Sequence, residues 1–449
     1  MLGVARRRRL VGNAERVGDE DALDRSYSLP SGMDASAGLP GRPQWARLLK
    51  VDTGDVDRIE GARWLSIYEP HAAFSLVEEL QHLSRRAVEA NPFFEPRFLV
   101  PAMPRLDDKA VRLIVVRDEG DGRSRLRFFM PFSVEAAAPF GRRKVVRGWT
   151  HPFGRLGVPP LDTDDPEATV AGLFDTLRAP KRGVPPVLVL PDLPLEGPLA
   201  RLVMRAALSR GLAIALSDRS SRATLNASVG NPDTYLRMTL GPRRHRDHGR
   251  RLRMLKGMGS LAFEAASDEA RVREAFEDFL YLEASGWKGR AGSALLQDRH
   301  RTAFAREAVN GLAAQGGARV YSLRLDGEAI GSLVVLLSNG RGVAWKTAYD
   351  ERFARARPGA LVAALATEAM IADPAIHSVD SCAVPDHGIL NPLWHGRMEI
   401  GTLVVALDPA ANHTVPQIAA DLDERRRRLH QRWKRRSRWR EFLARLTAR

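Results

Sequence analysis

Three predicted strands joined by very short turns constrain this chain more than any other feature of its sequence. They lie within residues 318–349, and the two links between them contain the pairs Asp326-Gly327 and Asn339-Gly340. Asp-Gly and Asn-Gly pairs readily adopt the positive φ angles of a two-residue hairpin turn. Strands joined in this way pair in antiparallel fashion, so we predict a β-meander here.

A helix start follows the last of these strands. After a polar loop, Arg357-Pro358-Gly359 opens an alanine-rich helix. Proline is favourable at the first helical position because the N–H that it lacks would be unpaired there, and glycine lets another group approach the backbone. We expect the N–H groups of Gly359, Ala360 and Leu361 to point out of the positive helix end, beside the Arg357 side chain. Such an arrangement is typical of a phosphate site.

The remaining periodicity is that of a mixed α/β protein. At 449 residues the chain is too long for one core, so we predict two domains. The expected segments are a leader at 1–44, an N-terminal domain at 45–220, a C-terminal domain at 221–408 and a basic helical tail at 409–449.

Further helices are predicted at 74–90, 168–177, 199–210, 269–285 and 298–313, and further strands at 111–116, 125–131, 186–190, 212–216, 378–383 and 401–407. At 91–96, two prolines are expected to end a helix and to place a phenylalanine pair in the core.

The positive charge of the chain is concentrated in its tail. Residues 421–449 carry twelve Lys and Arg against four Asp and Glu, which gives +8 of the chain's net +15. From Arg425 onward the tail has helical propensity, and its apolar residues fall within one half of the helical wheel. This pattern fits a helix packed on the body or on a partner, a helix on anionic lipid headgroups, or a nucleic-acid contact.

A second basic segment lies between the predicted domains. Residues 243–256 contain seven Lys and Arg on a predicted helix. The segment is either a solvated helix that bridges two domains or a surface that attracts a polyphosphate or a charged acceptor. His245 and His248 share a helix face there, but no carboxylate or cysteine pattern surrounds them, so we predict no metal site.

Several common classes are excluded by missing motifs. The chain contains no G-x-x-x-x-G-K-[ST], no H-E-x-x-H, no cysteine pair and no G-x-S-x-G. No apolar run approaches the roughly 18 residues of a membrane span. The single cysteine, Cys382, suits a reducing compartment. We therefore expect a cytoplasmic protein, with peripheral contact at the inner face of the membrane through its tail.

At this point the sequence resembles the GNAT acetyltransferase superfamily, and specifically its double-domain FemAB-like branch with the CelD-type proteins of cellulose and exopolysaccharide synthesis. The resemblance covers residues 45–408 and is carried most specifically by residues 283–290, 345–351 and 357–359, together with 91–96 and the 243–256 helix. It implies two GNAT-like domains in tandem, of which only the second has the pyrophosphate loop. The usual Q/R-x-x-G-x-G/A loop is shortened here to Arg357-Pro358-Gly359.

The resemblance also implies a donor and its binding residues. The donor would be acetyl-CoA or another acyl-CoA, which an amine or hydroxyl acceptor attacks directly. The loop and helix start (Arg357, Gly359, Ala360, Leu361) would hold the pyrophosphate, and a splayed strand at Ala344, Trp345 and Lys346 would offer an amide to the developing oxyanion.

Candidates for acid, base and acceptor contact lie near the expected cleft. Tyr349, Asp386 and His387 are the predicted catalytic residues, with His387 able to accept a proton near neutral pH beside Asp386. Glu283, Trp287 and Lys288 are expected to contact the acceptor. The alternative for Tyr349 is a buried core residue. The alternative for Glu283 is a cap, and that for Lys288 is a surface charge.

The predicted function is therefore acyl-CoA-dependent N- or O-acyl transfer to a small molecule or saccharide, in polysaccharide or cell-envelope biosynthesis. Two alternatives stay open at this point. One is aminoacyl transfer from a charged tRNA, as in other FemAB-like proteins. The other is a non-catalytic adaptor that docks to a membrane-bound polysaccharide synthase through its tail.

Overall fold

The computed structural model describes residues 56–60, 63–103, 110–120, 123–137, 143–179, 183–429 and 431. The strands within these residues form one mixed sheet of thirteen. In sheet order they are β1 (Val56–Glu60), β2 (Arg63–Tyr68), β3 (Arg112–Gly120), β4 (Arg123–Ala136), β5 (Lys144–Gly148), β6 (Val187–Pro194), β13 (Gly396–Ala406), β7 (Ile214–Asn226), β12 (Ser378–Asp380), β11 (Arg341–Tyr349), β10 (Glu328–Ser338), β9 (Ala318–Leu325) and β8 (Leu261–Ala266).

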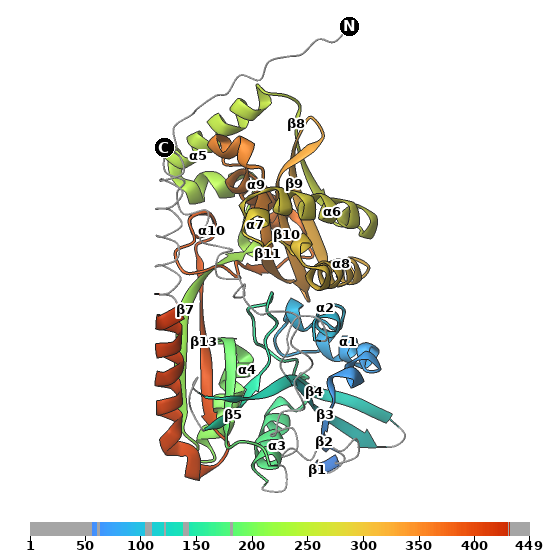
Figure 1. The fold of residues 1–449 in the computed structure, drawn as a ribbon, viewed down its shortest axis with the longest axis vertical. Coiled ribbons are helices and arrows are strands. Elements are labelled where there is room, and N and C mark those ends of the chain that lie inside the picture. Colours follow the sequence, from blue (N-terminus) through green and yellow to red (C-terminus); the bar gives the residue numbers. More distant parts are fainter. Residues whose placement is uncertain are drawn as a thin grey trace.

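The α-helices flank both ends of this sheet, so the predicted α/β fold is confirmed (Figure 1). We call the part from β1 to α4 the first half and the part from α5 to α10 the second half. The first half holds α1 (Val77–Arg85), α2 (Pro96–Ala102), α3 (Pro166–Arg178) and α4 (Pro198–Leu208). The second half holds α5 (Pro232–Lys256), α6 (Glu269–Ser285), α7 (Trp287–Arg290), α8 (Arg299–Ala313), α9 (Pro358–Ala372) and α10 (Leu390–Leu393).

The predicted β-meander is confirmed. Strands β9, β10 and β11 pair in antiparallel fashion in chain order. Both linking pairs have positive φ angles: 51° and 87° at Asp326 and Gly327, and 45° and 75° at Asn339 and Gly340. These angles match the mirror-image turn that suits the twist of paired strands, which is why the two pairs were informative.

The prediction for residues 91–96 was half right. Phe93 and Phe94 are buried, as expected. However, the second proline does not end a helix but begins one, because Pro96 is the first residue of α2. A proline there gives up no hydrogen bond, so the same residue that breaks a helix interior starts this one. The preceding helix is also shorter than predicted, since α1 begins at Val77 after a 3₁₀ turn, η4 (Pro70–Phe74).

Two long strands join the halves. The end of β7 pairs with β12, while most of its length pairs with β13. On its other edge, β13 pairs with β6 of the first half. The predicted boundary at residue 220 thus falls inside β7, and the strand that we expected to close the C-terminal domain completes the sheet of the first half. The domain boundaries themselves stay predictions.

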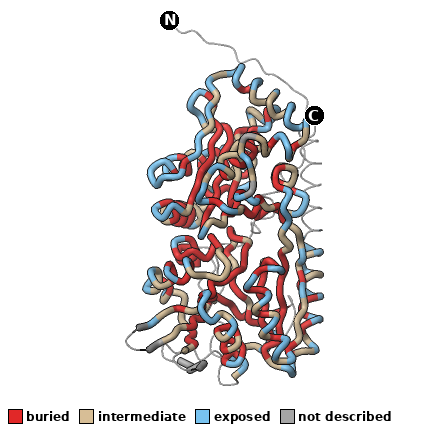
Figure 2. Tube along the Cα trace, turned by 180° about the vertical axis from the view of Figure 1, so that it is seen from behind, coloured by how far each residue is buried: buried red, intermediate tan, exposed pale blue. Residues whose placement is uncertain are grey.

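An aromatic cluster fills the seam between the halves. The Phe98 ring, on α2, lies 5.2 Å from the Phe304 ring on α8 and 5.7 Å from the Trp345 ring on β11. The indole N–H of Trp345 donates to the backbone oxygen of Phe153 at 2.8 Å. Buried chain runs through both halves along the sheet (Figure 2), so the seam is part of a continuous core.

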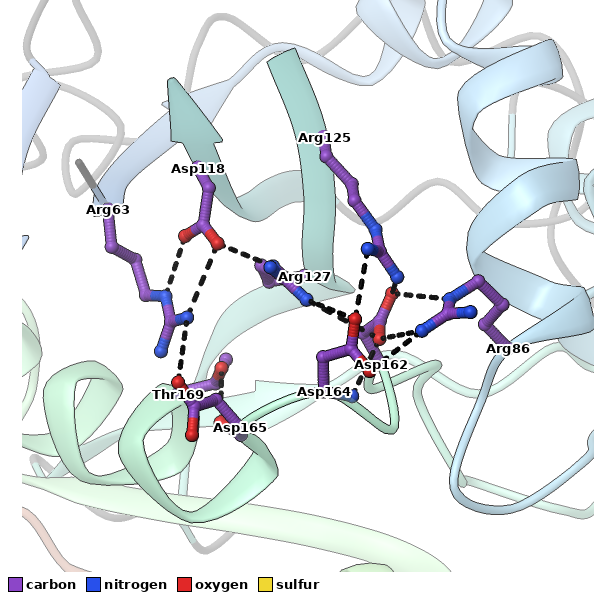
Figure 3. A network of polar contacts seen from close by, with 9 residues as sticks. All are labelled: Arg63, Arg86, Asp118, Arg125, Arg127, Asp162, Asp164, Asp165 and Thr169. Carbon is purple, nitrogen blue, oxygen red and sulfur yellow. Dashed lines mark hydrogen bonds and ion pairs between the residues drawn. The ribbon is translucent and has the colours of Figure 1, made fainter. Parts of the chain in front are cut away.

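Arginine and aspartate form a network in the first half, which we call the Arg–Asp network (Figure 3). The Asp162 carboxylate is fully buried and lies 2.7 Å from Arg125, 3.4 Å from Arg86 and 3.6 Å from Arg127. A second centre, Asp118, accepts hydrogen bonds from Arg127 at 2.6 Å and from Arg63 at 2.7 Å. The members are Arg63, Arg86, Arg125 and Arg127 with Asp118, Asp162, Asp164 and Asp165.

The tail helix starts earlier than predicted. Residues 415–429 are helical, and their buried residues, among them Ile418 and Leu422, pack against the body. The Asp423 carboxylate accepts hydrogen bonds from the Ser217 hydroxyl at 2.9 Å and from the Asp218 N–H at 2.7 Å. The apolar positions predicted beyond residue 431, and the predicted leader, lie outside the described residues. Within those residues, no helix is both long and apolar enough to cross a membrane.

Candidate active site

A gap opens in the sheet between β11 and β12. These two parallel strands pair only over residues 341–343 of β11. Beyond Val343 the edge of β11 that faces β12 has no strand partner, and β11 continues for six more residues to Tyr349. The backbone of Ala344, Trp345 and Lys346 therefore lies where the two strands separate, as the predicted splay requires.

A β-bulge lies at the same point. On β10, Val334 faces Lys346 and the next residue, Val335, faces Ala344, so Trp345 is an extra residue in β11. A bulge re-aims the side chains around it. Here Trp345 and Lys346 both reach Phe153, since the Lys346 ammonium lies 5.3 Å from its ring centroid. The bulge thus directs the side chains of Trp345 and Lys346 toward the face of the sheet that α6 covers.

Helix α9 begins beside this gap. Arg357 is exposed and has left-handed backbone angles of φ 52° and ψ 58°, and Pro358 is the first helical residue. We predicted three outward N–H groups, and this was wrong for two of them. The N–H groups of Ala360 and Leu361 both donate to the Arg357 oxygen, at 3.0 and 3.1 Å. Among the described residues, the Gly359 N–H has no acceptor, so it is the N–H of this turn that is open to a ligand.

A pocket lies where β11 ends and α9 begins. It is lined by Leu282, Glu283, Gly286, Trp287, Lys288, Thr347, Ala348, Tyr349, Gly359 and Ile389. The structure therefore brings together the predicted acceptor residues Glu283, Trp287 and Lys288 with Tyr349 and Gly359. At Gly359 an added Cβ would lie 3.4 Å from the Tyr349 ring, so the helix start lies next to that ring.

Two lysines share one carboxylate beside the pocket. The Glu283 side chain is 2% exposed, and its Oε1 lies 3.1 Å from the Lys346 ammonium and 3.4 Å from that of Lys288. Its Oε2 accepts the N–H of Leu295 at 2.8 Å. Lys288 also donates to the Thr347 backbone oxygen at 2.7 Å. We call Glu283, Lys288 and Lys346 the lysine pair site; with three ionised groups it carries one net positive charge.

This excess charge has a consequence for Lys288. Burial, with a further contribution from the charge of Lys346, lowers the pKa of Lys288 well below its usual value. A lysine with a lowered pKa has a larger neutral fraction near pH 7, and a neutral amine has a lone pair that accepts a proton. The interpretation of Lys288 as a surface charge was wrong, because Lys288 is buried. Glu283 does act as a cap, since it accepts the N–H of Leu295, where a 3₁₀ turn (Leu295–Gln297) begins.

Comparison with protein families identifies this part of the chain. Residues 242–386 match the family described as acetyltransferase (GNAT) domain. This segment is similar to GNAT acetyltransferase domains. No curated protein matches the chain.

Solved structures resemble the fold at low sequence identity. The crystal structure of FemX is 10% identical, with a TM-score of 0.49 over 75% of this chain and 97% of that chain. The C-terminal domain of a putative lysylphosphatidylglycerol synthetase from Agrobacterium fabrum is 13% identical, with a TM-score of 0.45 over 78% and 97%. A tandem GNAT protein from the clavulanic acid biosynthesis pathway is 14% identical, with a TM-score of 0.39 over 77% and 99%.

The remaining predicted catalytic residues, Asp386 and His387, are not part of the pocket lining. His387 is buried, its Nδ1 accepts the N–H of Leu390 at 3.0 Å, and its Nε2 has no hydrogen-bond partner among the described residues. Burial lowers the pKa of His387 to about 4, so the ring is neutral near pH 7. Asp386 is exposed, and no ion pair joins it to His387 in the described part of the chain. Both catalytic roles stay predictions.

The predicted basic segment is helical. Helix α5 bends at Gly241, which has φ 69°, and the seven basic residues of the predicted segment 243–256 follow that bend. Arg251 donates to the Arg355 backbone oxygen in the 3₁₀ turn η9 (Glu351–Ala356) that precedes α9. The exposed arginines of α5 and Arg355 thus belong to neighbouring segments next to the α9 start. Among the described residues, no group of three or more His, Cys, Asp or Glu could hold a metal.

The residues around Trp287 form a short helix, α7, which is folded against α6. An added Cβ at Gly289 would lie 1.7 Å from the Ala284 oxygen, so only glycine permits this close approach. The Trp287 N–H donates to the Glu351 carboxylate at 2.7 Å, which ties α7 to the turn after β11. Sequence reasoning did not find the pairing of Lys288 with Lys346, because they meet only through the fold.

Proposed function

We propose that the GNAT domain is an acyl-CoA-dependent N- or O-acyltransferase that acts on an amine or hydroxyl. The observation that carries the proposal is the gap between β11 and β12, with the open N–H of Gly359 at its side. An acyl donor with an extended shape fits such a gap, because the free edge of a strand offers backbone hydrogen bonds along its length.

The residues beside the gap fit a pyrophosphate group, with fewer donors than the sequence suggested. The Gly359 N–H, the positive end of α9 and the exposed Arg357 side chain would hold its charge. Backbone at Ala344 to Lys346 would face the acyl end. A bound acyl-CoA supplies a thioester carbonyl that is activated for attack.

Lys288 is the residue that we propose as the general base. Lys288 is one of the residues that line the pocket, and its lowered pKa favours the neutral form that can take the proton lost by the attacking amine or hydroxyl. Glu283 then lies beside the ammonium that forms, 3.4 Å away. Tyr349, on the same pocket wall, is placed to donate a proton to the leaving sulfur.

The binding step is tested by changing the helix start. Gly359→Glu puts a carboxylate beside the proposed pyrophosphate and should abolish acetyl-CoA binding in isothermal titration calorimetry. Arg357→Glu, at an exposed position, should weaken binding about tenfold or more while leaving the fold intact. Gly257→Glu, an exposed glycine outside the pocket lining, is the matched control and should bind normally. If wild-type protein binds neither acetyl-CoA nor longer acyl-CoAs, the proposal is wrong.

The chemical step is tested at Lys288. Lys288→Met should lower kcat by roughly 10²–10⁴ with little change in acyl-CoA affinity, because a general base contributes about that factor. Release of free CoA thiol, followed by its absorbance with a thiol reagent, measures the rate. An unchanged kcat in Lys288→Met would remove this residue from the mechanism.

For the acceptor and the location, we propose a saccharide of the cell envelope and peripheral contact through the tail. A deletion that tests the tail should not begin at residue 421, because Leu422 is buried and the Asp423 carboxylate accepts a hydrogen bond from Ser217 on β7. Deleting residues 432–449 spares these contacts. If the truncated protein loses membrane association but still transfers acyl groups, the tail serves to locate the protein at the membrane. Retained cellular function in Lys288→Met would instead support the non-catalytic adaptor.

A nucleic-acid-linked donor, such as aminoacyl-tRNA, is the second candidate. Its support is α5, where Arg243, Arg244, Arg246, Arg250 and Arg253 are exposed beside the α9 start. A phosphate backbone bound there would make affinity fall steeply with salt. Filter binding of tRNA at two salt concentrations, with Arg243, Arg244 and Arg246 changed to Gln, separates this candidate from the first.

A further inference from the structure

A second cavity lies in the seam between the halves, away from the pocket at α9. Its volume is about 210 Å³. The first half contributes residues of α1 and the start of α2, and the second half contributes the end of α8 and the β10–β11 turn. Its lining is Gln81, Arg85, Glu95, Leu312, Gln315, Gly316, Gly317, Leu337, Ser338, Asn339, Gly340 and Ala375.

A buried carboxylate without a cation lines this cavity. Glu95 is 5% exposed, and its Oε1 accepts hydrogen bonds from the hydroxyls of Ser84, at 2.6 Å, and Ser338. Its Oε2 accepts the Gln81 amide at 3.1 Å. Among the described residues, no Lys, Arg or His nitrogen lies within ion-pair distance of this carboxylate. A carboxylate has about four lone-pair sites, so one on Oε2 is left for a further donor.

A second unused acceptor lies next to it. Gln81 is 9% exposed and lines the cavity, and because its Nε2 donates to Glu95, its Oε1 is close to the same carboxylate. That Oε1 is buried and has no hydrogen-bond partner in the part of the chain that the structure describes. Leaving a buried acceptor unpaired costs about 1–3 kcal/mol, so such an atom points to a missing donor.

The surrounding backbone favours a positive ligand too. Helix α1 ends at Arg85 and α8 ends at Ala313, just before Gln315 and Gly316, so two helix C-termini meet at the cavity. Each carries a partial negative charge of about half an electron unit. Arg85 is exposed on the cavity wall and makes no ion pair in the described part of the chain. The cavity thus has a negative interior and one cation at its exposed side.

We propose that this cavity binds a small zwitterion of the size of an α-amino acid. The ammonium group donates to Glu95 Oε2 and Gln81 Oε1, and the ligand's anionic group pairs with Arg85. Because the lining comes from both halves, the ligand bridges the seam. This site is independent of the acyl-CoA proposal, and neither depends on the other.

The test uses the full chain and three probes of matched size: L-alanine, ethylammonium and propionate. Calorimetry and the thermal unfolding midpoint report binding. L-alanine should bind most tightly, ethylammonium at least tenfold more weakly, and propionate should not bind. No binding of L-alanine, or equal binding of L-alanine and ethylammonium, overturns the proposal.

Variants assign the binding to the two ends of the cavity. Arg85→Gln, at an exposed position, should remove the advantage of L-alanine over ethylammonium. Glu95→Gln keeps the acceptor and the side-chain shape but removes the charge, and should lower L-alanine affinity more than tenfold. Arg97→Gln is the matched control, since it removes an exposed arginine of α2 outside the cavity lining, and it should bind L-alanine as wild type does. If the Glu95→Gln variant does not fold, the Arg85→Gln variant provides the test. If Arg85→Gln still binds L-alanine more tightly than ethylammonium by the wild-type factor, the proposal is contradicted.

Discussion

The Arg–Asp network of the first half and the lysine pair site of the second half are both built from charged side chains, but they balance charge differently. The network sets four arginines against four aspartates, and its most central member, Asp162, is fully buried with three arginines around it. In the lysine pair site, two buried lysines lie within ion-pair distance of Glu283. Glu283 and Lys288 of this site line a pocket together with other predicted site residues.

The difference separates charges that stabilise the fold from charges that can react. In the network, burial raises the pKa of Asp118, but hydrogen bonds from Arg63 and Arg127 outweigh it and keep this pKa below its usual value, so the carboxylate stays ionised. In the lysine pair site, burial lowers the pKa of Lys288, with a further contribution from the charge of Lys346. A perturbed pKa in a pocket is a recognised mark of a functional group, whereas a balanced network is not.

The largest expected effect is at the centre of the network. Asp162→Asn removes a buried negative charge and leaves three arginines facing a neutral amide. We expect a loss of about 3 kcal/mol in the free energy of unfolding, since breaking a buried ion pair on one side costs about that much. Urea denaturation measures it. A loss below 1 kcal/mol would mean that the network is not what stabilises the first half.

A smaller effect is expected from balancing the lysine pair site. Lys346→Met leaves one lysine against Glu283 and removes the repulsion, so the pKa of Lys288 should rise toward its usual value of 10.5. In wild type the unfolded chain binds more protons than the native state between the lowered pKa and 10.5. The free energy of unfolding is therefore highest above this pH range, and it decreases as the pH falls through the range.

The measurement is the free energy of unfolding from pH 7 to pH 10. One group contributes a slope of at most about 1.4 kcal/mol per pH unit. We expect the stability of wild type to rise with pH relative to Lys346→Met. Parallel pH profiles for the two proteins would show that the charge of Lys346 does not control Lys288.

The smallest effect is expected at the edge of the network. The Asp165 side chain is 75% exposed and lies 3.8 Å from Arg63. Asp165→Asn should change the free energy of unfolding by less than about 0.5 kcal/mol, because exposed ion pairs contribute little. Asparagine also tolerates the left-handed backbone that Asp165 adopts, with φ 52°. This variant is the matched control for Asp162→Asn; a comparable loss in both would remove the distinction between centre and edge.

Local signals in the sequence predicted the second half well. Helix α6 and strands β9 and β11 have the predicted bounds, because the Asp-Gly and Asn-Gly turns, and the Asp268 cap of α6, act through adjacent residues. The pocket members Glu283, Trp287 and Lys288 were named because they flank one glycine-containing turn.

Contacts between distant segments could not be predicted in this way. Lys288 and Lys346 share Glu283 only because α6 packs on β11. The N–H groups of Ala360 and Leu361 were predicted to be open, but the left-handed Arg357 turns its carbonyl toward both. Sequence periodicity likewise gave no indication that β13 pairs with β6.

The position of β13 has a consequence for how the chain is made. Val187 on β6 pairs with Ala406 on β13, so the sheet of the first half stays incomplete until nearly the whole chain has been synthesised. Pairing between residues so far apart is slow, because a long loop must close first. A ribosome will have released the β9–β11 meander, whose pairings are local, well before β6 has a partner. During synthesis, the unpaired edge of β6 is therefore the surface that most needs protection from aggregation.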